Sequence, residues 1–134
     1  MHKRTKTLSE LSSNGFLWSA LVCTLAIAVL SLVPGKDLPK INISFFDKIG
    51  HFVAYAALSF SWGLFFIFER SIFSTRNAYI VASVSAIIYG AIMEFLQHFL
   101  VQSRTFDLYD ILANSLGAAI GIGVLKIYYS IVKN

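Results

Sequence analysis

The chain has 134 residues, of which 57% are hydrophobic and 13% charged, and its mean hydropathy is +0.70. Soluble domains carry roughly 25% charged residues, so the composition excludes an ordinary soluble protein and indicates a membrane protein. The net charge of +4 comes from Lys and Arg scattered at segment ends, with no basic stripe, so we expect no nucleic-acid partner.

Four apolar segments follow one another, at about residues 14–34, 49–68, 77–100 and 108–132. Each can cross about 30 Å of hydrocarbon as a helix that rises 1.5 Å per residue. A cleaved signal peptide is the alternative for the first segment, but apolar residues continue past the cleavage-like triplet at 26–28, which favours a retained span. The sequence therefore predicts one all-α membrane domain over residues 1–134, a bundle of four transmembrane helices.

The basic residues are unevenly divided between the two sides of such a bundle. One side has seven and the other has four, which are Lys36, Lys40, Lys48 and Arg104. Because cytoplasmic loops are enriched in Lys and Arg, we expect both termini in the cytoplasm.

The polar residues of the apolar region gather where the second segment begins, the third ends and the fourth begins. A four-pass topology brings these positions to one side of the membrane, the outer side in the predicted orientation. The predicted binding residues are Asp47, Lys48, His51, Tyr55, Glu94, Gln97, Arg104, Asp107, Asp110 and Asn114.

Helical spacing turns these residues toward one another. Asp47, His51 and Tyr55 step by four along the second segment. On the third segment Glu94 and Gln97 face inward, while Phe95 and Phe99 point elsewhere. With the polar residues of the fourth segment, these polar residues form three walls of one predicted pocket.

The fourth segment carries glycines below its polar residues, within a sector of roughly 80°. Gly117 and Gly121 lie on the same face as Asp110 and Asn114. Small residues at this spacing let another helix come close. The partner helix is either in the same chain or in a second copy, so a homo-oligomer through Gly117 and Gly121 stays open.

An ionised side chain at the centre of the membrane costs about 2.5–3.5 kcal/mol on insertion scales, so such groups are paired or functional. A binding pocket would use Arg104 as the contact for an anion. An intramembrane hydrolase or transferase would use His51, Glu94 or Asp107 as acid and base. An ion-pair network that only holds the helices together is the third alternative, and the residues leave open whether the chain is an enzyme.

Metal binding is a separate question, because Asp and His side chains are common metal ligands. Their spacing here matches no metal motif, so we expect neither a metal nor another cofactor.

Three ordered motifs carry a family resemblance. They are DKIGHFVAY at residues 47–55, YGAIMEFLQ at 89–97 and RTFDLYDILANSLG at 104–117. Together they resemble the VanZ-like family of small bacterial membrane proteins, whose named member contributes to teicoplanin resistance by an undetermined mechanism. The resemblance implies a multi-pass protein of the bacterial cytoplasmic membrane. For the pocket we favour a binding module, with a membrane lipid, a lipid-linked wall precursor or a lipoglycopeptide as the expected partner. It implies no catalytic role for any residue.

Overall fold

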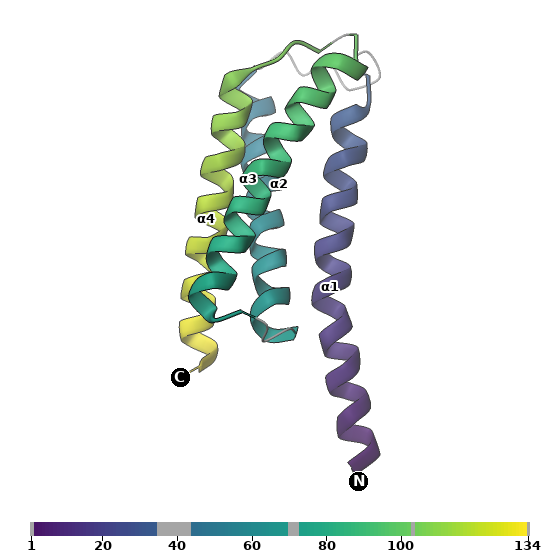
Figure 1. Cartoon of the computed structure of the whole chain (residues 1–134), viewed down its shortest axis with the longest axis vertical. Coiled ribbons are helices and arrows are strands. Elements are labelled where there is room, and N and C mark those ends of the chain that lie inside the picture. Colours follow the sequence, from purple (N-terminus) through teal and green to yellow (C-terminus); the bar gives the residue numbers. More distant parts are fainter. Residues whose placement is uncertain (1, 35–43, 70–72, 103, 134) are drawn as a thin grey trace.

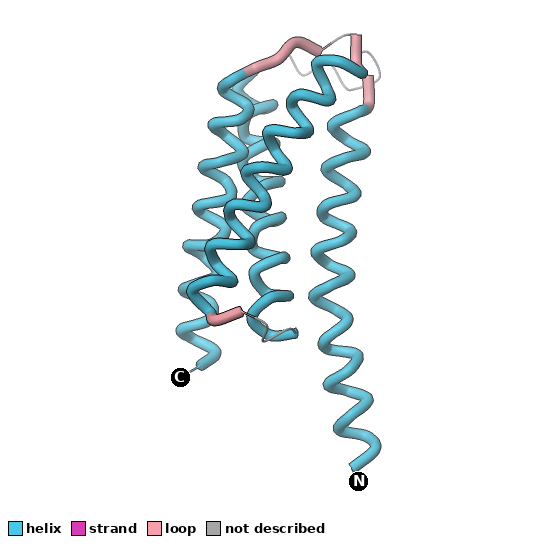
Figure 2. The backbone as a smooth tube through the Cα atoms, in the orientation of Figure 1, coloured by secondary structure: helices cyan, strands magenta, loops and turns pink. Residues whose placement is uncertain are grey.

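The computed structural model of the chain describes residues 2–34, 44–69, 73–102 and 104–133. Its elements are α1 (His2–Leu32), α2 (Ser44–Leu64), the π-helical turn η2 (Phe65–Glu69), α3 (Thr75–Leu100) and α4 (Leu108–Lys133). Both chain termini lie at one end of the bundle (Figure 1). The part of the chain described contains helices and loops but no strand (Figure 2), which confirms the all-α prediction.

All four helices are long and apolar enough to cross a membrane. The candidate spans contain 18 residues in α1, 25 in α2 with η2, and 26 in each of α3 and α4. At 1.5 Å per residue these lengths correspond to roughly 27–39 Å, close to or above the hydrocarbon thickness of about 30 Å. The protein is therefore a multi-pass membrane protein. Since α2 begins at Ser44 rather than near residue 49, Asp47 and Lys48 lie inside its first turns.

The outer surface of the bundle is apolar. Leu25 of α1, Ile88 of α3 and Leu116 of α4 are each more than half exposed, and many other large apolar side chains are exposed with them. In water, proteins with such an apolar surface would aggregate, whereas in a bilayer the apolar lipid tails solvate it. On α3 the predicted orientation is confirmed, because Glu94 and Gln97 are buried while Phe95 is 57% exposed.

The closest helix pair is α2 with α4, and glycines make the close approach. A Cβ atom on Gly117 would overlap the carbonyl of Phe52, and one on Gly121 would overlap the carbonyl of Ala56. Backbones can approach this closely only where one helix lacks side chains. The glycine face is thus occupied within the chain, so the predicted homo-oligomer contact through Gly117 and Gly121 is not supported.

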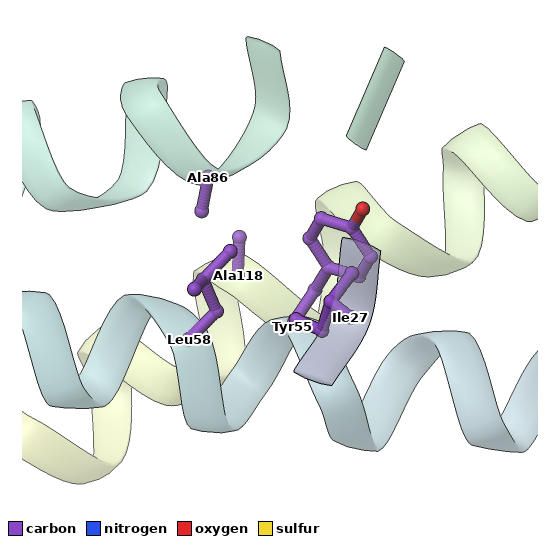
Figure 3. Close-up of a cluster of buried hydrophobic side chains, with 5 residues drawn as sticks. All are labelled: Ile27, Tyr55, Leu58, Ala86 and Ala118. Carbon is purple, nitrogen blue, oxygen red and sulfur yellow. The ribbon is translucent and has the colours of Figure 1, made fainter. Parts of the chain in front are cut away.

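One cluster of buried apolar side chains joins all four helices. It consists of Ile27, Tyr55, Leu58, Ala86 and Ala118 (Figure 3). Helix α1 contributes least to the interior, since 17% of its candidate span is buried against 33% for α4. It is therefore the most peripheral helix of the bundle.

Substitution of Gly117 by Ala tests the α2–α4 contact. We expect Gly117→Ala to lower the stability of the detergent-solubilised protein by about 1–3 kcal/mol, because the new methyl group meets backbone that cannot move aside. Gly123→Ala is the matched control, because nothing lies within 4 Å of a Cβ at that position. Thermal unfolding measures both variants, and equal stability for the two would contradict the proposed packing.

Candidate functional site

The predicted site residues all lie in the half of the bundle where α2 begins, α3 ends and α4 begins. The chain termini lie at the other end (Figure 1). Within this half the ten residues separate into two groups. Five of them, Lys48, Glu94, Asp107, Asp110 and Asn114, make bonds between the helices, and the other five line a cavity, with His51 also bonded to Asn114.

Lys48 is the centre of the network. Its Nζ lies 2.7 Å from Asp107 Oδ2 and 2.9 Å from Asp110 Oδ1, so one ammonium group joins α2 to the start of α4. Asp107 Oδ1 also accepts a hydrogen bond from the backbone N–H of Tyr109 at 2.8 Å, which caps α4. The Lys48 ammonium and this N–H stabilise the carboxylate and hold the pKa of Asp107 below its ordinary value.

Glu94 attaches the end of α3 to the same network. It is 2% exposed, and its Oε1 accepts a hydrogen bond from the backbone N–H of Asp107 at 2.8 Å. Its Oε2 is buried and has no hydrogen-bond partner among the described residues. The carboxylate thus positions the loop that leads into α4.

His51 lies between an amide and two carboxylates. Its Nδ1 is 3.0 Å from Asn114 Oδ1, and its Nε2 is 3.7 Å from Asp110 Oδ2 and 3.9 Å from Asp47 Oδ1. In the tautomer with a proton on Nδ1, the ring donates this hydrogen bond to Asn114 Oδ1. The other ring nitrogen then faces two acids, an arrangement suited to binding or passing a proton.

The buried amide of Asn114 has room because the residue facing it on α3 is a glycine, Gly90. A Cβ on Gly90 would lie 3.0 Å from Asn114 Nδ2 and 2.9 Å from the ring of Tyr55. Gly90 therefore allows the polar groups of α2 and α4 to meet behind α3.

A cavity of about 250 Å³ opens beside the network, between α1, α2 and the end of α3. Five predicted site residues line it, namely Asp47, His51, Tyr55, Gln97 and Arg104. We call this cavity the polar pocket. Arg104 forms no ion pair within the described residues, and the buried hydroxyl of Tyr55 has no hydrogen-bond partner there.

Helix α1 supplies the opposite wall of the polar pocket, which sequence reasoning missed. Ile27, Leu30 and Ser31 line it, and the carbonyl of Ser31 accepts a hydrogen bond from Gln97 Nε2 at 2.9 Å. A backbone carbonyl has no sequence signature. The spacing of Ala20, Ile27 and Ser31 along one helical face was the available signal, and these three are buried among the α1 residues from Gly15 to Leu32.

Three possible metal ligands meet at the edge of the pocket. One ligand atom from each of Asp47, His51 and Asp110 lies within 4.8 Å of the others. Asp110 is already paired with Lys48, and the side chain of Asp47 is 53% exposed. These contacts describe an ion-pair cluster around His51, and the absence of a metal stays a prediction.

Comparison with known proteins assigns the family. The pattern of the VanZ/LLP1 family matches residues 5–129. The chain belongs to the VanZ/LLP1 family. This VanZ/LLP1 chain is also 32% identical over 108 residues to an uncharacterised protein of Schizosaccharomyces pombe, covering 78% of this chain and 63% of the yeast protein. It thus spans less than two thirds of that relative, and no solved structure matches it.

The family assignment confirms the resemblance drawn from the three motifs. The family assignment shows neither a bacterial origin nor a connection with teicoplanin, since the relative described above is a yeast protein. Those two statements stay predictions for this VanZ/LLP1 chain.

Acid should weaken the contact between Lys48 and Asp107. Because the folded-state pKa of Asp107 lies below its ordinary value of 3.8, the ion pair contributes stability above that pH. The contribution is lost as the pH falls through the folded-state pKa. Asp107→Asn keeps an acceptor that can cap α4 but removes the charge. We expect this variant to be less stable than the wild type near neutral pH, with the difference closing in acid.

Thermal unfolding of both proteins in detergent, from neutral to strongly acidic pH, measures this difference. All other acidic side chains are the same in both proteins, so the comparison centres on Asp107. A stability gap that stays constant down to the lowest pH would show that the ion pair contributes nothing.

Proposed function

We propose that this VanZ/LLP1 protein is a membrane-embedded binding module whose polar pocket takes the charged headgroup of a cell-envelope amphiphile. The ligands in this class are a membrane lipid, a lipid-linked wall precursor and a glycopeptide-type drug with an acyl chain. The observation that carries the proposal is Arg104, a cation that lines the pocket and has no ion pair within the described residues.

The chemistry of the lining suits such a ligand. A guanidinium group binds phosphate or carboxylate with two parallel hydrogen bonds. The unpartnered hydroxyl of Tyr55 can donate a further bond, and the Asp47 carboxylate can accept from a hydroxyl or amine of the headgroup. Ile27, Leu30 and Phe46 supply an apolar side. The pairing of charged and apolar walls is what a molecule with a headgroup and a chain requires.

The size of the pocket agrees with a headgroup rather than a whole lipid. Its volume of about 250 Å³ lies just below the range of roughly 300–1,000 Å³ typical of small-molecule sites. Lys48, Glu94 and Asp107 are bonded within the network and do not line the pocket. We therefore assign them to the frame that holds the pocket open.

An intramembrane hydrolase or transferase that acts on phosphate-bearing envelope substrates is the second candidate. The position of His51 favours it, because the ring lines the pocket and has carboxylates near its Nε2. Such a histidine could act as general acid or base while Arg104 stabilises developing charge. The other two catalytic candidates, Glu94 and Asp107, have no direct access to the pocket.

A purely structural role accounts for only part of the cluster. The contacts of Lys48 explain why Asp107 and Asp110 are retained. They do not explain Arg104, which adds no ion pair to the described part of the bundle. We therefore limit the structural interpretation to the network.

For its location, we propose the bacterial cytoplasmic membrane with both termini in the cytoplasm and the polar pocket facing outward. The positions of the termini at one end of the bundle and the seven basic residues predicted on that side support this orientation (Figure 1). Protection against a lipoglycopeptide would follow if the pocket retained the drug's acylated headgroup.

Arg104→Gln tests the headgroup site. We expect it to weaken binding of dodecyl phosphate at least about tenfold, because charged hydrogen bonds contribute about 1.5–3 kcal/mol. The protein is placed in phosphatidylcholine nanodiscs, and bound probe is counted by native mass spectrometry. Arg76→Gln is the control, because Arg76 is an exposed cation in the first turn of α3, at the other end of that helix. Equal binding by both variants would overturn the proposal.

Turnover separates the two candidate functions. Purified wild type is incubated with lipid phosphates and lipid-linked wall precursors, and released product is measured. The enzyme hypothesis requires product that disappears in His51→Gln. Retention of the lipid without product favours the binding module.

Reporter fusions test the orientation. Alkaline phosphatase, which is active only outside the cytoplasm, is fused after Asn134 or inserted between residues 36 and 42. We expect activity from the insertion alone. Activity from the C-terminal fusion would invert the orientation and place the polar pocket on the cytoplasmic side.

A further inference from the structure

A second cavity, of about 270 Å³, lies beneath α1 at a deeper level of the bundle. Its walls come from Thr24 of α1, Leu58 and Trp62 of α2, and Ala86 and Tyr89 of α3, and they are almost wholly apolar. We call it the apolar cavity. It lies outside the polar cluster and contains none of the predicted site residues.

Three of the polar residues at the wall of the apolar cavity, Thr24, Trp62 and Tyr89, are hydrogen-bonded to one another. Trp62 Nε1 donates to Thr24 Oγ1 at 3.0 Å, and Tyr89 Oη donates to the carbonyl of Thr24 at 2.8 Å. An occupant therefore needs no polar atoms of its own. Apolar voids in proteins accept apolar molecules; an enclosed, engineered cavity of about 150 Å³ in another protein binds benzene.

The apolar cavity continues the line of the polar pocket. On α1 the two are lined by Thr24 and Ile27, and on α2 by Leu58 and Tyr55, so they lie about one helical turn apart on each helix. Three of these side chains, Ile27, Tyr55 and Leu58, also belong to the buried cluster of Figure 3. A single elongated molecule beneath α1 would reach both.

We propose that the apolar cavity is the binding site for an alkyl chain of the amphiphile whose headgroup occupies the polar pocket. This inference rests on the proposed function and extends it to the class of ligand, an anionic lipid with an unbranched chain that lies along α1. Together the two cavities reach the volume of an ordinary ligand site, which neither reaches alone.

The chain has a route of entry from the bilayer. Ser85 lines the apolar cavity and is exposed on α3. Helix α1, which contributes Thr24 to the wall of the cavity, is the least buried of the four spans. An alkyl chain that enters from lipid moves from one apolar environment to another. Its binding free energy therefore comes from van der Waals contacts that fill the void, and not from leaving water.

Chain length provides the test. Octyl, dodecyl and hexadecyl phosphate are compared at equal mole fractions in phosphatidylcholine nanodiscs, with bound probe counted by native mass spectrometry. We expect wild type to bind dodecyl phosphate about fourfold or more better than octyl phosphate, because the added methylene groups gain dispersion contacts with the lining of the apolar cavity. Binding that does not change with chain length would overturn the inference.

Ser85→Phe places a ring at the mouth of the apolar cavity. It should weaken binding of the longer chains most and so remove their advantage over octyl phosphate. Val84→Phe is the matched control, because Val84 is 47% exposed on the same helix and does not line the cavity. If the two variants select chains equally, the apolar cavity is not the chain site. Size-exclusion chromatography verifies folding, and the wild-type series decides the question if Ser85→Phe does not fold.

The two proposals fail in different ways. If none of the three phosphates binds, or if Arg104→Gln binds all of them as well as wild type does, the headgroup site is wrong and this inference falls with it. If all three bind through Arg104 with equal affinity, the headgroup site stands and only the chain site is excluded.

Discussion

The ion pair of one lysine with two aspartates determines the arrangement of the polar half of this bundle. Lys48 Nζ lies within 2.9 Å of both Asp107 and Asp110, and Glu94 holds the backbone of Asp107 from the third helix. Charged groups are costly near lipid unless they are paired. Lys48 forms the ion pairs with these carboxylates. Arg104 is therefore outside that network and lies at the wall of the polar pocket.

The close packing of α2 on α4 has a consequence for the opposite side of the molecule. Because Gly117 and Gly121 draw these helices together, α1 remains at the periphery, with few hydrogen bonds to the rest. Both cavities lie along α1, one charged and one apolar. The close α2–α4 pair and the peripheral position of α1 together provide a physical basis for binding a molecule that arrives from within the bilayer.

Much of this could be predicted from the sequence. Segment length and hydropathy predict four spans, and helical spacing places Glu94 and Gln97 inside while Phe95 faces out. The motifs correctly indicated the VanZ/LLP1 family. The division of the ten polar residues could not be predicted, because it depends on which side chains meet across helices. Asp47 and Asp107 are both aspartates near the start of an apolar segment. In the structure, however, Asp107 is paired with Lys48 and Asp47 lines the pocket.

By itself, the sequence determined that the chain crosses the membrane and that its polar groups gather in one half of the bundle, since both follow from local hydropathy and helical period. Only the tertiary structure decided that the glycine face packs against α2 within the chain and that α1 forms a wall of the polar pocket. The reason is geometric. A glycine permits a close contact without specifying the partner, and a backbone carbonyl such as that of Ser31 becomes a ligand for Gln97 only once two helices are adjacent.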